Sequence, residues 1–132
     1  MPAGQRVVQV CLFLVAAIAL FGGSVQLLLG QPDTTPRLDN VHRFMAGVYL
    51  SMGFICLWAG ITVRQHTTLI LLIALAVFMA AVGRLVSMAI VGLPQPHAVW
   101  LAYLGSELIV PVVMLWGYFG SRRSAAPGAA HA

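Results

Sequence analysis

Apolar residues fill four long stretches of the chain, and polar residues, glycine and proline gather in the short segments between them. A helix needs about 20 mostly apolar residues to cross a hydrocarbon core roughly 30 Å thick. Each stretch reaches this length, so the pattern predicts four transmembrane helices. Their expected ranges are 7–29, 41–63, 69–91 and 98–119.

The polar segments indicate where these helices end. Prolines in 30–37 and 92–96 cannot continue a helix, and the polar run 64–68 is typical of a short turn. Asp39 or Asn40 is placed to cap the first turn of the second helix. The first apolar stretch is too long for the apolar core of a secretory signal, so we expect it to remain as a helix.

Composition supports a membrane protein and argues against a nucleic-acid partner. Hydrophobic residues make up 61% of the chain and charged residues 8%, whereas about a quarter of a soluble domain is charged. The net charge of +4 comes from arginines without any lysine, and no basic stripe with interleaved aromatic residues accompanies it. The length predicts one domain, 1–120, followed by a disordered cytoplasmic tail, 121–132.

The arginines predict the orientation in the membrane. Arg6, Arg64, Arg122 and Arg123 fall on one side, and positive residues mark the cytoplasmic side. Both termini are therefore expected to be cytoplasmic. Short connections favour antiparallel neighbours. The predicted fold class is all-α, an integral membrane antiparallel four-helix bundle.

Arg84 and Glu107 lie well inside the apolar stretches, where a charged side chain costs about 2.5–3.5 kcal/mol on insertion scales. Arg84 precedes the centre of the turn 92–96 by about ten residues and Glu107 follows it by about twelve, so a rise of 1.5 Å per residue places them at similar depths. We expect the two side chains to pair between adjacent helices or to share a polar pocket.

Further polar residues fall in the same half of the predicted bundle, which is expected to face outward. Asp39 and Arg43 have the spacing at which side chains meet on one helix face. The candidate ligand-binding residues are Arg43, Arg84, Glu107, Asp39, Ser87, Gln26 and His42. We expect no metal site, because no ligand spacing enforces one. Cys11 and Cys56 are expected to pack as small apolar side chains.

Four blocks of the sequence resemble a known family. They are 39–50 with Gly53, 83–87, 92–96, and 107–111 ahead of Leu115 and Trp116. In order and spacing they resemble the small bacterial membrane proteins grouped as "domain of unknown function 4345", over about residues 7–116. The resemblance implies a multi-pass, four-helix protein of the inner (plasma) membrane and implies no activity. The residues that match the family pattern are Asp39, Arg43, Arg84, Ser87 and Glu107.

The four-helix plan is also broadly similar to DoxX-like membrane proteins, some of which associate with quinone or redox chemistry. Architecture alone does not define function. Small residues recur along the expected helices, which favours close helix packing or a homo-oligomer face. These residues are Gly22, Gly23, Gly47, Gly53, Gly60 and Gly83. No residue pattern in the sequence indicates a particular cofactor, so the cofactor is unknown.

Three roles remain open for the polar residues. The first is a non-catalytic membrane module with an outward-facing polar pocket for a lipid, quinone or small anion, or one that assists a partner membrane protein. The second is a membrane-embedded enzyme, isomerase-like or cyclase-like, acting on a hydrophobic substrate with Glu107 as acid/base. The third is a structural ion pair between Arg84 and Glu107 that defines helix register. Transport or channel activity is a further hypothesis and ranks last, because four short helices enclose little lumen and such a role needs oligomers.

The separation of Arg84 and Glu107 distinguishes these roles. A guanidinium in contact with a carboxyl keeps it ionised and makes it a poor general acid. Contact in the resting protein therefore disfavours the enzyme, whereas separation across a cavity favours it.

Overall fold

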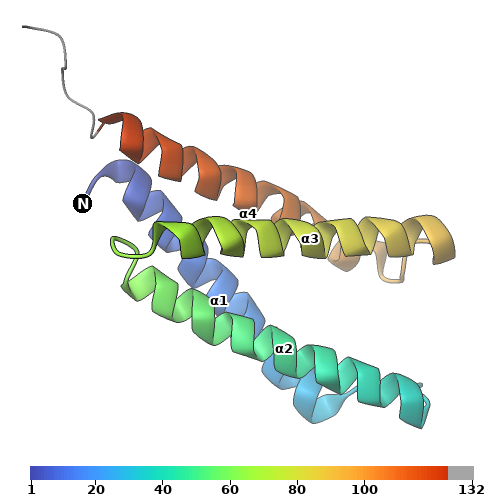
Figure 1. Cartoon of the computed structure of the whole chain (residues 1–132). Helices are drawn as coiled ribbons and strands as arrows, with labels where there is room; N and C mark the ends of the chain where they lie inside the picture. The colour runs from blue at the N-terminus through green and yellow to red at the C-terminus, as the bar shows by residue number, and fades with distance from the viewer. Residues whose placement is uncertain (125–132) are drawn as a thin grey trace, which may run out of the picture. The chain divides into compact units, whose positions relative to one another are not determined.

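The structure, a computed structural model, describes residues 1–124 and consists of four α-helices joined by short connections (Figure 1). They are α1 (Ala3–Leu29), α2 (Pro36–Ile61), α3 (Thr67–Val91) and α4 (His97–Ser124). The described part of the chain contains no strand. The all-α class and the four predicted helices are therefore confirmed.

Each helix is long and apolar enough to cross a membrane. The helices have 25 to 28 residues, which exceeds the roughly 20 residues that a bilayer core requires. Between 17% and 28% of the residues in each apolar window are buried inside the protein. Most of the apolar surface therefore needs lipid to cover it, because water would impose a large hydrophobic cost on so much exposed area.

The start of α2 corrects the predicted cap. Neither Asp39 nor Asn40 caps this helix, because α2 begins at Pro36 and its N-cap is Thr35. The hydroxyl of Thr35 accepts a hydrogen bond from the amide of Leu38 at 3.3 Å. Proline suits the first helical position, where its missing N–H would be unsatisfied anyway. Asp39 lies in the first turn, where a negative charge interacts favourably with the helix dipole.

The end of α4 also differs from expectation. Residues 121–124, assigned to a disordered tail, continue the helix to Ser124. Arg122 and Arg123 lie in the last turn, where positive charge is favourable beside the free carbonyls. The remainder of the predicted tail, 125–132, lies outside the described residues.

The chain divides into two compact units. We call residues 9–62, which contain most of α1 and all of α2, the α1–α2 unit. The α3–α4 unit combines residues 1–8 with the chain from Val63 onward. The expectation of one domain over 1–120 stays a prediction.

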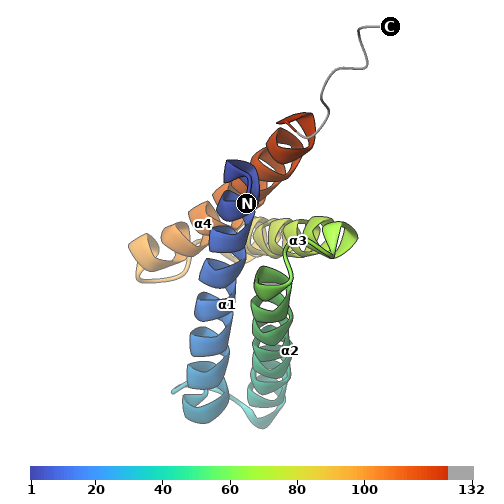
Figure 2. The same cartoon turned by 90° about the vertical axis from the view of Figure 1, so that its left-hand side faces the viewer.

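Close contacts at glycine hold α1 and α2 side by side (Figure 2). A Cβ on Gly53 would lie 2.8 Å from Leu20 Cγ, and one on Gly23 would lie 3.0 Å from the amide nitrogen of Leu50. These approaches fit the small-residue packing that membrane helices use. In contrast, a Cβ on Gly47 would meet nothing within 4 Å. The predicted close packing is confirmed at Gly23 and Gly53 and is wrong within the α1–α2 unit at Gly47.

Polar side chains connect the two helices at both ends of the α1–α2 unit. Arg43 of α2 donates through Nη1 to the carbonyl of Leu27 in the last turn of α1. Gln9 of α1 donates through Nε2 to the carbonyl of Gly60, in the last turn of α2, at 2.9 Å. The last carbonyls of a helix have no partner inside the helix. Each helix therefore supplies a donor for the other, which matters most where lipid replaces water.

Helices α3 and α4 pack against each other within the α3–α4 unit. On α3, buried Ile70, Ala74 and Ala81 recur at helical spacing. On α4, Val110 and Met114 are buried in the same way. The first turn of α1 belongs to this unit too, since the carbonyl of Gly117 lies where a side chain at Gly4 would be.

Candidate functional site

The strongest polar feature of the α3–α4 unit is the pair of charged residues on its two facing helices. Arg84 continues the buried positions of α3 three residues after Ala81. Glu107 precedes buried Val110 by three residues on α4. Residues three or four apart share a helix face. The apolar pattern on each helix thus turns both charged residues toward the neighbouring helix.

Arg84 and Glu107 form a hydrogen-bonded ion pair. Nε of Arg84 donates to Oε2 of Glu107 at 2.7 Å. The Glu107 side chain is 11% exposed and that of Arg84 is 28% exposed, so the carboxylate is the more deeply enclosed partner. The predicted pairing is confirmed. Its short distance is typical of a charge-assisted hydrogen bond.

Two aromatic rings cover the guanidinium of Arg84. Its Cζ lies 5.5 Å from the ring centroid of Trp100 and 5.3 Å from that of Tyr103. Both distances fall within the roughly 6 Å range of cation–π attraction. Trp100, Tyr103 and Glu107 are spaced by three and four residues, so one face of α4 supplies all three partners of Arg84. We call Arg84, Trp100, Tyr103 and Glu107 the Arg84 cluster.

Sequence reasoning missed the two rings of this cluster. Trp100 and Tyr103 lie near the start of α4, where aromatic residues are typical of the membrane interface, so their positions alone indicate no contact with Arg84. The available signal was the spacing of positions 100, 103 and 107, which repeats the interval that defines a shared helix face.

Pro111 adds a backbone acceptor beside Glu107. It lies inside α4 and is buried. Proline has no amide hydrogen, so the carbonyl of Glu107 lacks the donor that residue 111 would otherwise provide. Position 107 therefore combines a side chain bonded to Arg84 with a backbone carbonyl that lacks its usual helical donor.

The chemistry available to the cluster follows from which atoms are occupied. Glu107 contacts Arg84 through Nε, so the two terminal nitrogens of the guanidinium are outside this hydrogen bond. A guanidinium presents its donors in a rigid plane that matches carboxylate and phosphate oxygens. The cluster thus offers a partly exposed cation, aromatic surface and a carboxylate already held by its counter-ion.

The second predicted pair lies in the α1–α2 unit. Nε of Arg43 donates to Oδ2 of Asp39 at 2.9 Å, which confirms the expected contact. A Cβ on Gly30 would lie 2.8 Å from Nη2 of Arg43, and Gly30 has a positive φ of 67° that favours glycine. Together with its bond to the Leu27 carbonyl, this geometry gives Arg43 a structural role at the connection between α1 and α2.

Gln26, His42 and Ser87 are the remaining candidates, and no hydrogen bond or ion pair connects their side chains in the described residues. Gln26 is partly exposed near the end of α1, and Ser87 is exposed on α3 one turn after Arg84. His42 is partly exposed on α2, and its Nδ1 is buried without a hydrogen-bond partner in the described chain. Gln26 and His42 belong to the α1–α2 unit, whereas Ser87 belongs to the α3–α4 unit. Their predicted roles in ligand binding stay predictions.

Cysteine and metal chemistry add little to the site. Cys11 and Cys56 are free and buried, as expected for small apolar side chains. Among residues 1–124, no three His, Cys, Asp or Glu side chains gather as metal ligands.

Four apolar helices and a charged pair between two of them define a multi-pass membrane protein. The chain belongs to the family described as "Domain of unknown function (DUF4345)", whose family model matches residues 6–118. The resemblance noted from the sequence is thereby confirmed. No curated protein and no solved structure matches the chain.

Proposed function

We propose that this protein is a non-catalytic membrane module whose Arg84 cluster binds a lipid, a quinone or a small anion. The observation that carries the proposal is the state of Arg84, which is partly exposed, paired through Nε alone and flanked by two rings. Guanidinium nitrogens suit carbonyl and anionic oxygens. The rings of Trp100 and Tyr103 provide a surface on which a planar or hydrocarbon group packs.

The contact between Arg84 and Glu107 favours binding over catalysis. The carboxylate lies 2.7 Å from its counter-ion and is largely enclosed. A general acid or base needs a proton or lone pair within reach of substrate, and Glu107 directs its carboxylate to Arg84 instead. This argues against the membrane-embedded isomerase or cyclase in which Glu107 acts as acid/base.

The proposal includes a topology. Arg6, Arg64, Arg122 and Arg123 would face the cytoplasm, with both termini inside, in an antiparallel four-helix bundle. The turn 92–96, and with it the Arg84 cluster, would then lie toward the outside. Placement in the bacterial inner membrane, likeness to DoxX-like proteins, and a homo-oligomer or membrane protein partner stay predictions.

Native mass spectrometry tests the proposal directly. The protein is released from mild detergent or nanodiscs beside Arg84→Gln, with Arg43→Gln as the matched control, since both changes remove an arginine paired with a carboxylate. We expect a small-molecule adduct on wild type and Arg43→Gln that disappears from folded Arg84→Gln. Wild type without any adduct, or an adduct retained by Arg84→Gln, would contradict the proposal.

Fluorescence gives a second test with a known probe. Replacing Trp58 and Trp116 by Phe leaves Trp100 as the only tryptophan, beside Arg84. If the cluster binds a quinone, a short-chain quinone should quench Trp100 saturably in this background, and Arg84→Gln should abolish the saturable part. Linear quenching that is equal in both proteins would exclude a quinone and leave a lipid or anion as the ligand.

A further inference from the structure

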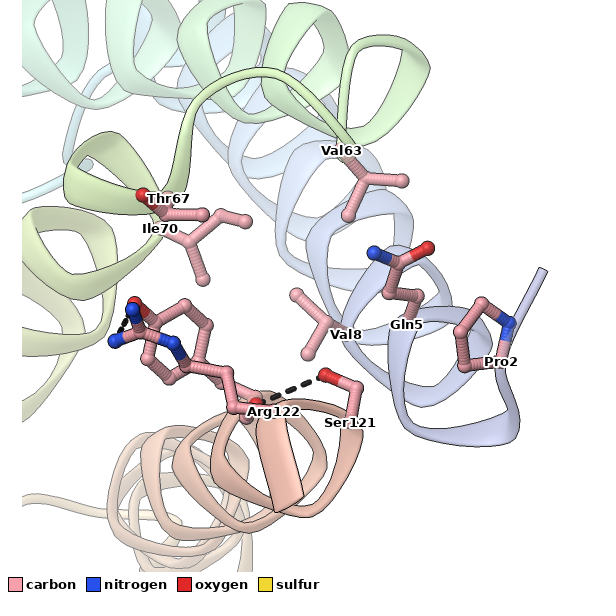
Figure 3. Close-up of a pocket in the computed structure, with 9 residues that line it drawn as sticks. Pro2, Gln5, Val8, Val63, Thr67, Ile70, Ser121 and Arg122 are labelled. Atoms are coloured by element: carbon pink, nitrogen blue, oxygen red, sulfur yellow. Dashed lines mark hydrogen bonds between the residues drawn. The ribbon is translucent and has the colours of Figure 1, made fainter. Parts of the chain in front are cut away.

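A cavity of about 150 Å³ lies in the α3–α4 unit (Figure 3). Its wall comes from three segments: Pro2 with the first turns of α1, Val63 with the start of α3, and the last turns of α4. The start of α3 and the last turns of α4 are the ends of these helices away from the turn 92–96. All the lining residues belong to the α3–α4 unit. An apolar cavity of about this size holds a molecule such as benzene, so there is room for a head group and not for a whole lipid.

The wall of this cavity is amphipathic. Val8 and Ile70 are buried and form apolar surface, whereas Gln5, Thr67 and Arg122 bring an amide, a hydroxyl and a guanidinium. A site that offers both kinds of surface suits a ligand with a polar head and a hydrocarbon body. Sequence reasoning left this half of the α3–α4 unit without a site, because the three segments meet only in the folded chain.

Arg122 is anchored by a neutral partner. Its Nη1 donates to the hydroxyl of Tyr118 at 3.3 Å, and its Cζ lies 5.6 Å from the Tyr118 ring centroid. Figure 3 shows the Arg122 side chain at the cavity beside Ser121. Tyr118 is buried and Arg122 is exposed. The aromatic residue therefore positions the guanidinium without neutralising its charge.

The α3–α4 unit supplies no acidic partner for this end. Glu107 is its one Asp or Glu, and it is already paired with Arg84. Arg6, Arg64 and Arg123 add further positive charge to the same terminal segments. Unpaired arginines at a membrane surface attract anionic lipid head groups.

We propose that this cavity binds the phosphate of an anionic phospholipid. The phosphate oxygens pair with Arg122 and accept hydrogen bonds from Gln5 and Thr67, while the attached glycerol and first methylene groups pack on Val8 and Ile70. Arginine suits this role because its fork of N–H donors matches two phosphate oxygens. The site is separate from the Arg84 cluster and does not depend on the function proposed for it.

Native mass spectrometry of the detergent-solubilised protein, titrated with phosphatidylglycerol and separately with phosphatidylcholine, measures the binding. Arg122→Gln removes the cavity arginine, and Arg123→Gln is its control, because it removes the same charge one residue away from a position outside the wall. We expect saturable phosphatidylglycerol binding to wild type and Arg123→Gln, weakened about tenfold or more in Arg122→Gln. Equal weakening of phosphatidylglycerol binding in both variants would mean that the arginines act only through the positive charge of the surface. That result would overturn the proposed cavity site.

A second pair of variants tests the cavity while every arginine stays in place. Thr67→Leu fills space at the wall, whereas Thr68→Leu makes the same change at the next residue, outside the wall. Both positions are exposed, so both variants should fold, which thermal unfolding checks. We expect phosphatidylglycerol binding to fall in Thr67→Leu alone. Unchanged binding in Thr67→Leu, or equal binding of phosphatidylcholine, would overturn the proposal.

Competition separates a lipid from a soluble anion as the source of the phosphate. The complex with phosphatidylglycerol is challenged with millimolar inorganic phosphate and with glycerol 3-phosphate. Retention of the lipid supports a membrane ligand, because the acyl chains and glycerol contribute binding. Displacement by either soluble anion would overturn the assignment to a lipid and identify the cavity as a site for free phosphate compounds.

Discussion

Arg84 on α3 and Glu107 on α4 are 23 residues apart in the chain, and Nε of the one lies 2.7 Å from Oε2 of the other. Two rings from the same face of α4 cover the guanidinium. The carboxylate that neutralises Arg84 and the aromatic surface that shields it thus come from a single helix. Any loss of register between α3 and α4 would separate the cation from all three partners together.

The ion pair should show strong coupling in a double-mutant cycle. Arg84→Met leaves the enclosed carboxylate of Glu107 unpaired, and Glu107→Met leaves the guanidinium unpaired, so each should cost about 1–3 kcal/mol. The double variant should cost less than the sum, because no isolated charge remains. Thermal or denaturant unfolding in detergent measures the three values. Additive losses would mean that the two side chains do not interact in the folded protein.

The rings should stabilise Arg84 through their faces. Tyr103→Leu removes the ring and should cost about 0.5–1 kcal/mol, whereas Tyr103→Phe keeps the ring and should be nearly neutral. In an Arg84→Met background the difference between Leu and Phe should shrink, since the cation is gone. The free energy of unfolding in detergent is measured for Tyr103→Leu and Tyr103→Phe, each with and without Arg84→Met. If the difference between the Leu and Phe variants persists without Arg84, the ring stabilises the protein by packing alone.

Gly53 should be sensitive to a single methyl group. A Cβ there would lie 2.8 Å from Leu20 Cγ and 3.0 Å from the Leu20 amide nitrogen, so Gly53→Ala should destabilise the α1–α2 unit by about 1–3 kcal/mol through overpacking. Gly47→Ala is the control on the same helix, where nothing lies within 4 Å. It should be neutral, or stabilising by about 0.5–1 kcal/mol through helix propensity. Equal melting temperatures for the two variants would contradict the close approach.

Arg43 should control local motion more than global stability. Its ion pair with Asp39 is partly exposed, and exposed pairs contribute about 0–1 kcal/mol. Arg43→Gln should therefore leave the melting temperature almost unchanged and accelerate hydrogen exchange around Gly30, because the bond to the Leu27 carbonyl is lost. Arg37→Gln, an exposed arginine in the first turn of α2, should leave that exchange unchanged.

The position of the α2 cap also has a direct test. Thr35→Ala removes the hydroxyl that accepts from Leu38 and should cost about 1 kcal/mol, within the range for helix caps. Asn40→Ala changes the residue that the apolar pattern suggested as a cap and should cost less than about 0.5 kcal/mol, as for surface positions. A larger cost at Asn40 than at Thr35 would move the start of the helix back toward residue 41.

Several elements were predictable because they depend on local composition. Four apolar stretches of sufficient length require four helices, since a bilayer leaves backbone groups no partners other than each other. The pairing of Arg84 with Glu107 was also predictable, because residues at similar distances from one turn reach similar depths. In contrast, the cap of α2 was placed wrongly. The apolar pattern begins at Val41, whereas Thr35 and Pro36 start the helix several residues earlier.

The sequence by itself determined that the chain spans a membrane, which segments do so, and that Arg84 and Glu107 need partners, because length, hydropathy and the cost of burying charge are local properties. Only the tertiary structure decided that Trp100 and Tyr103 cover Arg84. It also decided that Arg43 donates to the α1 carbonyl of Leu27, and that Arg122 lines a cavity between three distant segments. These contacts depend on how each helix is rotated about its axis and on how closely it packs against its neighbours. Both are results of packing between segments that are distant in the sequence, so the pattern along one segment does not reveal them.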